Sequence, residues 1–201
     1  MQAQSLKDMR QQVNQANNNA LRANRLATEA QEEVKSIKEV VSLDTTSWRS
    51  ETQTLIAKIA RNQGGFEHIN LLKSESYELL NKRFGVNLEI RLTNKRRRMA
   101  EEGVTKSKRD KLNYLDVIAE DKKLIEGYVA IVKDMAIKWI KDTALPAVKE
   151  VATAFVAELK NSATDEKGWV KFRDTIFLPV AINGSLWIIE KVVNKLAPAE
   201  E

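Results

Sequence analysis

The stretch KLIEGYVAIVKDMAIKWIKDTALPAVKEVATAFVAELK (residues 123–160) carries a broad apolar helical pattern. Large apolar side chains recur every three or four residues, which is the period of one face of an α-helix. We expect Pro146 to kink or restart this helix, because proline lacks the amide hydrogen that an inner turn requires. The stretch therefore predicts the main core of a helical domain. Its predicted core residues are Leu124, Tyr128, Ile131, Val132, Met135, Ile140, Val148, Val151, Phe155 and Leu159.

The composition agrees with an all-α fold. The chain of 201 residues contains only seven glycines and three prolines, which is little turn material for a β-sandwich or a barrel. The absence of cysteine excludes a disulfide scaffold, a cysteine-ligated zinc site and a thiol nucleophile. The formal charge of +5 favours anionic partners such as nucleic acid or an acidic membrane surface.

Residues 1–43 carry a second helical pattern, in which gaps of three and four residues alternate without interruption. This heptad seam predicts a coiled-coil stalk through which the protein forms a homo-oligomer. Alanine in the middle of the seam buries little area per layer, so the stalk is expected to be a weak zipper. The alternative is a single amphipathic helix folded back on its own domain. The seam residues are Leu6, Met9, Val13, Ala16, Ala20, Ala23, Ala27, Ala30, Val34, Ile37 and Val41.

The remaining boundaries follow from capping and turn residues. Residues 44–65 are predicted to form a connecting helix that begins near Trp48 and ends at Gly64 and Gly65. Residues 66–201 then form the helical domain. The predicted fold is an elongated all-α protein, with an N-terminal coiled-coil helix followed by a helical C-terminal domain.

Residues 82–111 concentrate positive charge, with eleven basic and four acidic residues. Gly85, Asn87 and Gly103 predict a helix between two short turns, and the helix starting at residue 105 or 107 is expected to continue into the core stretch. This spacing resembles a helix-turn-helix unit. The candidate nucleic-acid-binding residues are Lys82, Arg83, Arg91, Lys95, Arg98, Lys106, Lys108 and Arg109.

Not every cation of this segment can face one groove, because the arginines at 96–98 span nearly a full helical turn. Arg91, Lys95 and Arg98 share one stripe of the predicted helix, whose apolar side is formed by Leu88, Leu92 and Met99. Arg96 and Arg97 point elsewhere and are expected to be solvated or paired with Glu101 and Glu102. The alternative for the whole segment is a solvated helix face.

Residues 77–140 resemble the C-terminal region of phage and prophage antirepressor-type proteins. The resemblance rests on RFGV at residues 83–86, G-x-T-K at 103–106 and LDVI-x-x-D at 115–121, around the basic helix. It covers about a third of the chain, and none of its motifs is a catalytic signature. The resemblance implies a phage origin and contact with nucleic acid or a regulator.

The C-terminal segment at residues 175–193 is strongly apolar. Residues 175–189 are short for a membrane span, and the N-terminus has no apolar run that would indicate a signal peptide. We prefer a buried final helix, broken near Asn183 and Gly184, with Trp169 and Phe172 reaching back to the core. The alternative is a membrane-interface helix.

Catalytic and cofactor signatures are absent from the sequence. His68 is the only histidine, and neither a phosphate-binding loop nor a nucleophile motif occurs. We therefore expect a protein that is not an enzyme and has no cofactor. The first hypothesis is a phage-encoded regulatory or accessory protein in the cytoplasm of a bacterial host, which binds nucleic acid and oligomerises through its stalk. The alternatives are a factor that inhibits a host or defence protein, and a membrane-associated helical assembly.

Overall fold

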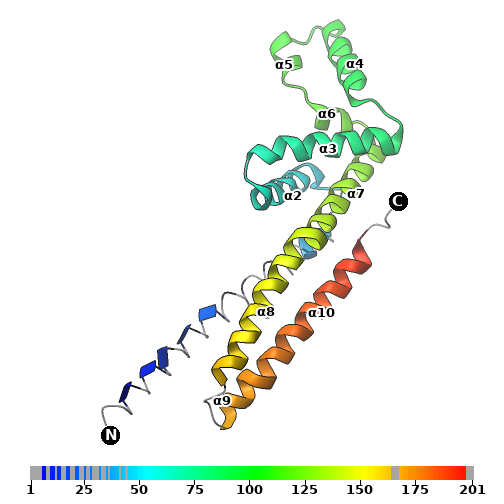
Figure 1. Ribbon diagram of the computed structural model, residues 1–201. Coiled ribbons are helices and arrows are strands. Elements are labelled where there is room, and N and C mark those ends of the chain that lie inside the picture. Colours follow the sequence, from blue (N-terminus) through cyan, green and yellow to red (C-terminus); the bar gives the residue numbers. More distant parts are fainter. Residues whose placement is uncertain are drawn as a thin grey trace. The chain divides into compact units, whose positions relative to one another are not determined.

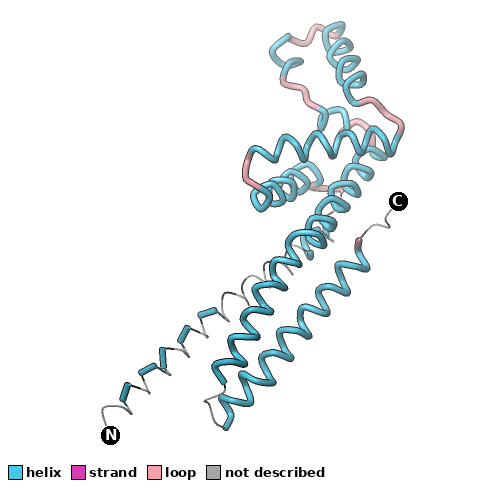
Figure 2. Tube along the Cα trace, viewed as in Figure 1, coloured by secondary structure: helices cyan, strands magenta, loops and turns pink. Residues whose placement is uncertain are grey.

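The computed structural model describes residues 45–163 and 168–197, together with scattered positions nearer the N-terminus. These positions are 6–7, 10–11, 13–14, 17–18, 21–22, 25, 28, 32, 35, 37–40 and 42–43. Within these described residues every regular element is a helix and no strand occurs (Figure 2). The predicted all-α fold class is therefore confirmed.

Two compact units divide the chain: the central unit, Glu39–Trp139, and the terminal unit, Met1–Lys38 with Ile140–Glu201. Each unit has its own helices and its own apolar contacts. The central unit contains α2 (Trp48–Gln63), α3 (Glu67–Phe84), α4 (Leu88–Glu101), α5 (Lys106–Asp110), α6 (Tyr114–Ile118) and α7 (Lys122–Trp139). Gly64 and Gly65 form the turn between α2 and α3, inside this unit.

The core of the central unit lies where α2, α3 and α7 pack against one another (Figure 1). Tyr128 of α7 is fully buried there. The edge of the Trp48 ring meets it at 5.9 Å, and the Tyr77 ring stacks on it at 5.8 Å. Burial raises the pKa of the Tyr128 phenol above its ordinary value, so the ring stays neutral in the core. The first half of the apolar stretch at 123–160 therefore supplies this core.

Local caps end the helices where the sequence predicts. Gly64 and Gly85 follow α2 and α3 with φ angles of 139° and 62°, values that glycine adopts readily. Asn87 caps α4, because its side-chain oxygen accepts a hydrogen bond from the backbone N–H of Ile90 at 2.9 Å. These three predicted helix ends are confirmed.

The single long helix predicted from residue 105 or 107 onward is wrong, since α5, α6 and α7 follow one another with short breaks. Asn113 and Asp116 form a capping box that starts α6, with their side chains bonded to the first backbone N–H groups. The Asp121 side chain accepts a bond from the Lys123 N–H at 3.0 Å and starts α7. Asparagine and aspartate side chains at both breaks thus compete with helix continuation.

The terminal unit contains the π-helix η1 (Ile140–Ala144), α8 (Leu145–Ser162), α9 (Gly168–Phe172), the π-helix η3 (Arg173–Phe177) and α10 (Leu178–Leu196). Helices α8 and α10 lie side by side and run antiparallel (Figure 1). Phe155 and Leu159 of α8 pack against Leu178 and Ile182 of α10. The pairing continues along both helices to the Lys149–Glu190 ion pair at 2.7 Å.

Each π-helix ends two residues before a proline, η1 before Pro146 and η3 before Pro179. Proline has no N–H to donate, and its ring clashes with the carbonyl four residues earlier. A wider turn just before the proline relieves this conflict without ending the helical path. The sequence predicts that the helix kinks or restarts at Pro146, and the structure shows α8 starting anew at Leu145 after η1.

Three expectations for the C-terminal segment are wrong. Helix α10 runs through Asn183 and Gly184 without a break, because an inner glycine costs a helix only about 1 kcal/mol. Trp169 and Phe172 do not reach the core: their side chains are 67% and 45% exposed, and their rings contact each other. The final helix is not buried either, since one face packs against α8 while the other faces solvent.

The described positions of the N-terminal segment before residue 41 are helical. Among the predicted seam residues only Leu6, Val13 and Ile37 are described, and the other eight lie outside the described residues. Leu6 and Val13 are well exposed, so at these two positions the apolar seam has no cover from the chain itself. The coiled-coil stalk stays a prediction.

Candidate nucleic-acid interface

The basic segment is positioned by α4, which packs against α6. Leu88 and Leu92 on α4 are buried, as predicted, and Met99 is half-buried. The Asn87 cap fixes where α4 begins, and the 3.6-residue period then sets the direction of every side chain that follows. The stripe of cations is therefore placed by the packing of two leucines.

Arg91, Lys95 and Arg98 do share one stripe, and that stripe faces the protein's own acidic residues. Arg91 pairs with Asp121 at 3.5 Å between Nη1 and Oδ2. Lys95 and Arg98 both pair with Glu120, at 3.0 Å and 3.5 Å. Glu120 and Asp121 lie in the turn between α6 and α7. The three cations are thus partly neutralised within the central unit.

Lys95 is the most enclosed of the three, with only 16% of its side chain exposed. Its Nζ donates to the backbone carbonyl of Asp116 at 2.8 Å, so it holds α4 to α6. The side-chain carboxylate of Asp116 accepts a separate hydrogen bond from Arg49 of α2 at 2.8 Å. These contacts join three helices of the central unit around Asp116.

The ionisation of Asp116 follows from these neighbours. Partial burial by itself would raise the pKa of the carboxyl group. The hydrogen bond from the Asn113 N–H, the bond and charge of Arg49 and the charge of Lys95 outweigh it and hold the pKa below its ordinary value. Asp116 therefore stays charged well into the acid range, as the ion pairs require.

Two further arginines bond within the central unit. Arg83 donates from both Nη atoms to Asp134 Oδ2, each at 3.0 Å. Arg96 donates to the carbonyl of Leu112 at 2.8 Å, while its buried Nε has no partner among the described residues. The expected pairing of Arg96 with a glutamate at helical spacing is therefore wrong.

A second group of cations faces solvent near the end of α3, on α4, and on or beside α5, which begins after the positive φ of Gly103. Lys82, Lys106 and Lys108 are exposed and have no acidic partner within the described part of the chain. Arg97 and Lys111 belong to the same group, although they are not among the predicted binding residues. Arg109 is half-buried, and its buried Nε lacks a partner within the same part of the chain. The predicted site thus divides into an internal set and a solvent-facing set.

The sequence contains a signal for this division, because the acids that neutralise the stripe follow the basic segment closely. Asp116, Glu120 and Asp121 add three negative charges just beyond residue 111. The excess of seven positive charges over residues 82–111 falls to four over residues 82–121. The free positive charge is therefore concentrated on Arg97 and the lysines of residues 106–111.

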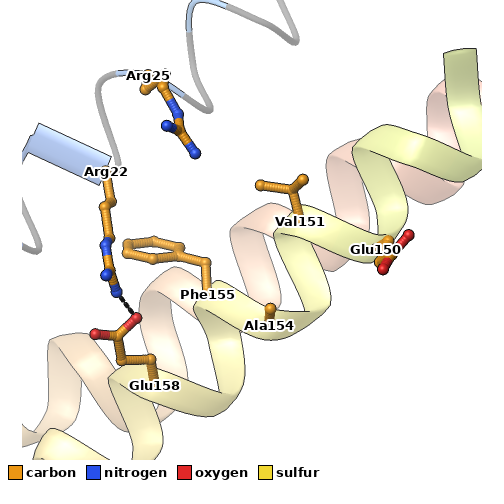
Figure 3. Close-up of a pocket in the computed structure, with 7 residues that line it drawn as sticks. All are labelled: Arg22, Arg25, Glu150, Val151, Ala154, Phe155 and Glu158. Atoms are coloured by element: carbon orange, nitrogen blue, oxygen red, sulfur yellow. Dashed lines mark ion pairs between the residues drawn. The ribbon is translucent and has the colours of Figure 1, made fainter.

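A groove of about 440 Å³ lies in the terminal unit between the N-terminal segment and α8 (Figure 3). Arg22 forms an ion pair with Glu158 across it, and Arg25 and Glu150 also line it. Its floor is formed by Val151, Ala154 and Phe155 of α8. Among the described residues there is no group of three or more histidine or acidic side chains that could hold a metal ion. The groove thus offers charge and a small apolar floor.

Comparisons with known proteins do not assign the chain to a family. A scan against protein-family models, a search of curated proteins and a search of solved structures each found no match.

Proposed function

We propose that the protein is a non-enzymatic regulatory or accessory protein of phage origin, which binds nucleic acid in the cytoplasm of its bacterial host. The observation that carries the proposal is the solvent-facing set of cations, Lys82, Arg97, Lys106, Lys108 and Lys111, none of which has an acidic partner among the described residues. The resemblance of residues 77–140 to antirepressor-type proteins supports the phage origin and the regulatory role.

Exposed lysines suit phosphate contacts because each contact releases a condensed counterion from the nucleic acid. Lys106, Lys108 and Lys111 lie within six consecutive residues, so one stretch of backbone can meet all three. By contrast, Arg91, Lys95 and Arg98 would have to leave Glu120 and Asp121 before they could contact a phosphate. The solvent-facing set is therefore the primary contact surface in this proposal.

Oligomerisation through residues 1–43 would strengthen a weak interaction of this kind. Two or more copies on one stalk convert the second binding event into an intramolecular one, which raises avidity without any new contact. The exposure of Leu6 and Val13 supports such an association, because both are seam residues. Deletion of residues 1–38, which lie outside the central unit, is expected to give an assembly of lower mass in light scattering. An unchanged mass would rule out the stalk.

The proposal is tested by fluorescence anisotropy with generic duplex DNA at several salt concentrations. The slope of log affinity against log salt changes by about 0.9 for each phosphate contact on duplex DNA. The triple variant with Lys106, Lys108 and Lys111 changed to Ala is therefore expected to flatten the slope by about 2.7. No binding by the unmodified protein at low salt would refute the proposal.

The matched control removes three exposed lysines elsewhere in the central unit, by changing Lys122, Lys123 and Lys138 to Ala. Both triple variants lose the same net charge, so a general electrostatic effect would flatten both slopes equally. The proposal requires the loss to be confined to the variant at residues 106–111. Equal losses would mean that no specific surface is used.

A protein partner is the second candidate. Phe66 and Leu71 are 72% and 65% exposed at the start of α3, although both are large apolar side chains. Exposed apolar residues of this size mark protein interaction sites when they cluster. An affinity capture from host extract, with and without nuclease treatment, separates the two candidates. Capture of one host protein that survives nuclease and is lost in Leu71→Asp would favour a protein partner.

A further inference from the structure

An exposed apolar face runs along the last helical segment of the chain. Helices α9, η3 and α10 follow one another without a break over the 29 residues of Gly168–Leu196. Only 17% of the most apolar 18-residue window of this segment is buried, although its length and composition would suit a membrane helix. Large apolar patches left in water usually mark a site of contact. The question is which kind of surface this face meets.

The segment has two distinct faces. Leu178 and Ile182 pack against α8, and Ile189 and Val193 are buried. The opposite side exposes large apolar side chains in two groups, at residues 169–180 and 187–192, on the side of the helix that α8 does not cover. These side chains are between 39% and 67% exposed: Trp169, Val170, Phe172, Ile176, Phe177, Val180, Trp187, Ile188 and Val192.

The charged side chains of this segment that have no ionic partner among the described residues are all positive. Its only acidic residues are Asp174, which is buried and bonded to Arg173, and Glu190, which is paired with Lys149 of α8. Lys171 near one end and Lys191 and Lys195 near the other are exposed and have no acidic partner among the described residues. The exposed face therefore carries two groups of large apolar side chains, separated by small and polar residues at 183–185, and it has lysines near both ends.

Tryptophan marks both ends as well. Trp169 and Trp187 are separated by eighteen positions, or about 27 Å along a helix. The Nζ of Lys191 lies 5.6 Å from the centre of the Trp187 ring. Tryptophan favours the boundary between hydrocarbon and lipid headgroups, and lysine favours the anionic headgroups outside it. Both ends of the face thus match the chemistry of a lipid–water interface.

The helix is long enough to cross a bilayer, but its charged residues and those of α8 argue against a simple span. The uncharged stretch at residues 175–189 has fifteen residues and reaches about 22 Å, whereas a span needs about 20 residues and 30 Å. The partner helix α8 also carries Lys149, Glu150 and Glu158, which would have to enter hydrocarbon with it. A helix of this kind lies in the plane of the membrane, with its apolar face towards the acyl chains.

Charge decides between a lipid surface and a second copy of the chain. In a two-fold dimer the same face meets itself, so Lys171, Lys191 and Lys195 would approach other lysines with no free acid on that face to pair with them. An anionic lipid surface supplies the opposite charge instead. We propose that the exposed face of Gly168–Leu196 docks in the plane of an anionic lipid bilayer. This docking is independent of nucleic-acid binding by the central unit.

The test uses the full chain and vesicles of phosphatidylcholine alone or with one third phosphatidylglycerol. The protein is expected to float with the anionic vesicles and at least tenfold less with the neutral ones. Tryptophan emission should shift to shorter wavelength on binding. Only Trp169 and Trp187 can produce this shift by insertion, because Trp48 and Trp139 are already buried.

Ile188→Asp is the decisive variant, and Ile90→Asp is its matched control, because both isoleucines are 58% exposed on helices. Ile188→Asp is expected to reduce flotation at least tenfold, and Ile90→Asp to leave it unchanged, with both helical by circular dichroism. Absence of flotation, or equal losses in both variants, would overturn the proposal. If the unmodified protein does not bind vesicles but forms an oligomer that dissociates in Ile188→Asp, the face contacts a second copy of the chain instead.

Discussion

Lys95 offers the sharpest test of how the basic segment is used, because its ammonium group is bonded inside the protein. Lys95→Ala removes the bond to the Asp116 carbonyl and the ion pair with Glu120. A hydrogen bond from a charged donor contributes about 1.5–3 kcal/mol, and a half-exposed ion pair about 0.5 kcal/mol. The free energy of unfolding should therefore fall by about 2 kcal/mol.

Urea unfolding followed by far-ultraviolet circular dichroism measures this loss. In a chain of this size a loss of that magnitude corresponds to a fall in Tm of about 4–8 °C. Arg97→Ala is the matched control, because Arg97 lies on the same helix, is exposed and has no partner among the described residues. It should change the free energy of unfolding by less than about 0.5 kcal/mol.

Lys95→Met separates the packing of the side-chain stem from the polar contacts, since methionine keeps most of the apolar stem and loses the ammonium group that makes both of them. The reasoning is refuted if Lys95→Ala and Arg97→Ala are equally stable. It is also refuted if Lys95→Ala weakens DNA binding more than Arg97→Ala does while its stability is unchanged. Either result would mean that Lys95 is free to contact an external anion.

Three further predictions concern the scaffold. Leu80→Ala should lower the free energy of unfolding by about 2.7–5 kcal/mol, because Leu80 is fully buried in α3. Leu79→Ala is the control and should cost less than about 1 kcal/mol, because Leu79 is 38% exposed. Urea unfolding measures both. The lowered pKa of Asp116 means that its stabilisation is present above its ordinary pKa of 3.8 and is lost as the pH falls through the lower folded value. The stability difference between the parent and Asp116→Asn should therefore shrink below about pH 4, and a difference independent of pH would contradict this. Gly184→Ala should raise Tm by stabilising α10 by about 0.5–1 kcal/mol, because an added Cβ there meets open space, and a lower Tm would contradict an unbroken helix.

The internal pairing of the basic stripe has a consequence for specificity. Any anion that reaches Arg91, Lys95 or Arg98 competes with the carboxylates of Glu120 and Asp121, which are held beside the stripe by the fold. A competitor in that position has a high effective concentration. Weak or non-specific anions are therefore excluded from the stripe, whereas the lysines of residues 106–111 have no such competitor among the described residues.

Local features of the fold are predictable from the sequence because their causes lie within a few residues. The cap at Asn87 and the helix ends at Gly64 and Gly85 depend on backbone conformations that these residue types favour. The change of helix type before Pro146 follows in the same way from the missing N–H of proline. The helix breaks at Asn113 and Asp121 have an equally local cause, and the apolar period through residues 105–140 obscured it.

Pairings between residues that are distant in the sequence could not be predicted from it. Heptad and helical periods show which residues share a face, and the stripe of Arg91, Lys95 and Arg98 is a correct example. They do not show what the face meets, because Glu120 and Asp121 reach the stripe only after α4 has packed on α6. The solvent-facing cations are those that have no acidic partner among the described residues after these helices have packed.

Residue types and short-range spacing were enough to predict that the protein is helical, where α2 and α3 end, where α4 begins, and where the cations are concentrated. Which cations are neutralised, and which apolar side chains stay in water, depends on how the helices pack against one another. Ile188 and Ile189 are neighbours with the same side chain, yet Ile188 is 58% exposed and Ile189 is 8% exposed. The difference arises because α8 covers one side of α10, and burial is a property of the packed pair of helices.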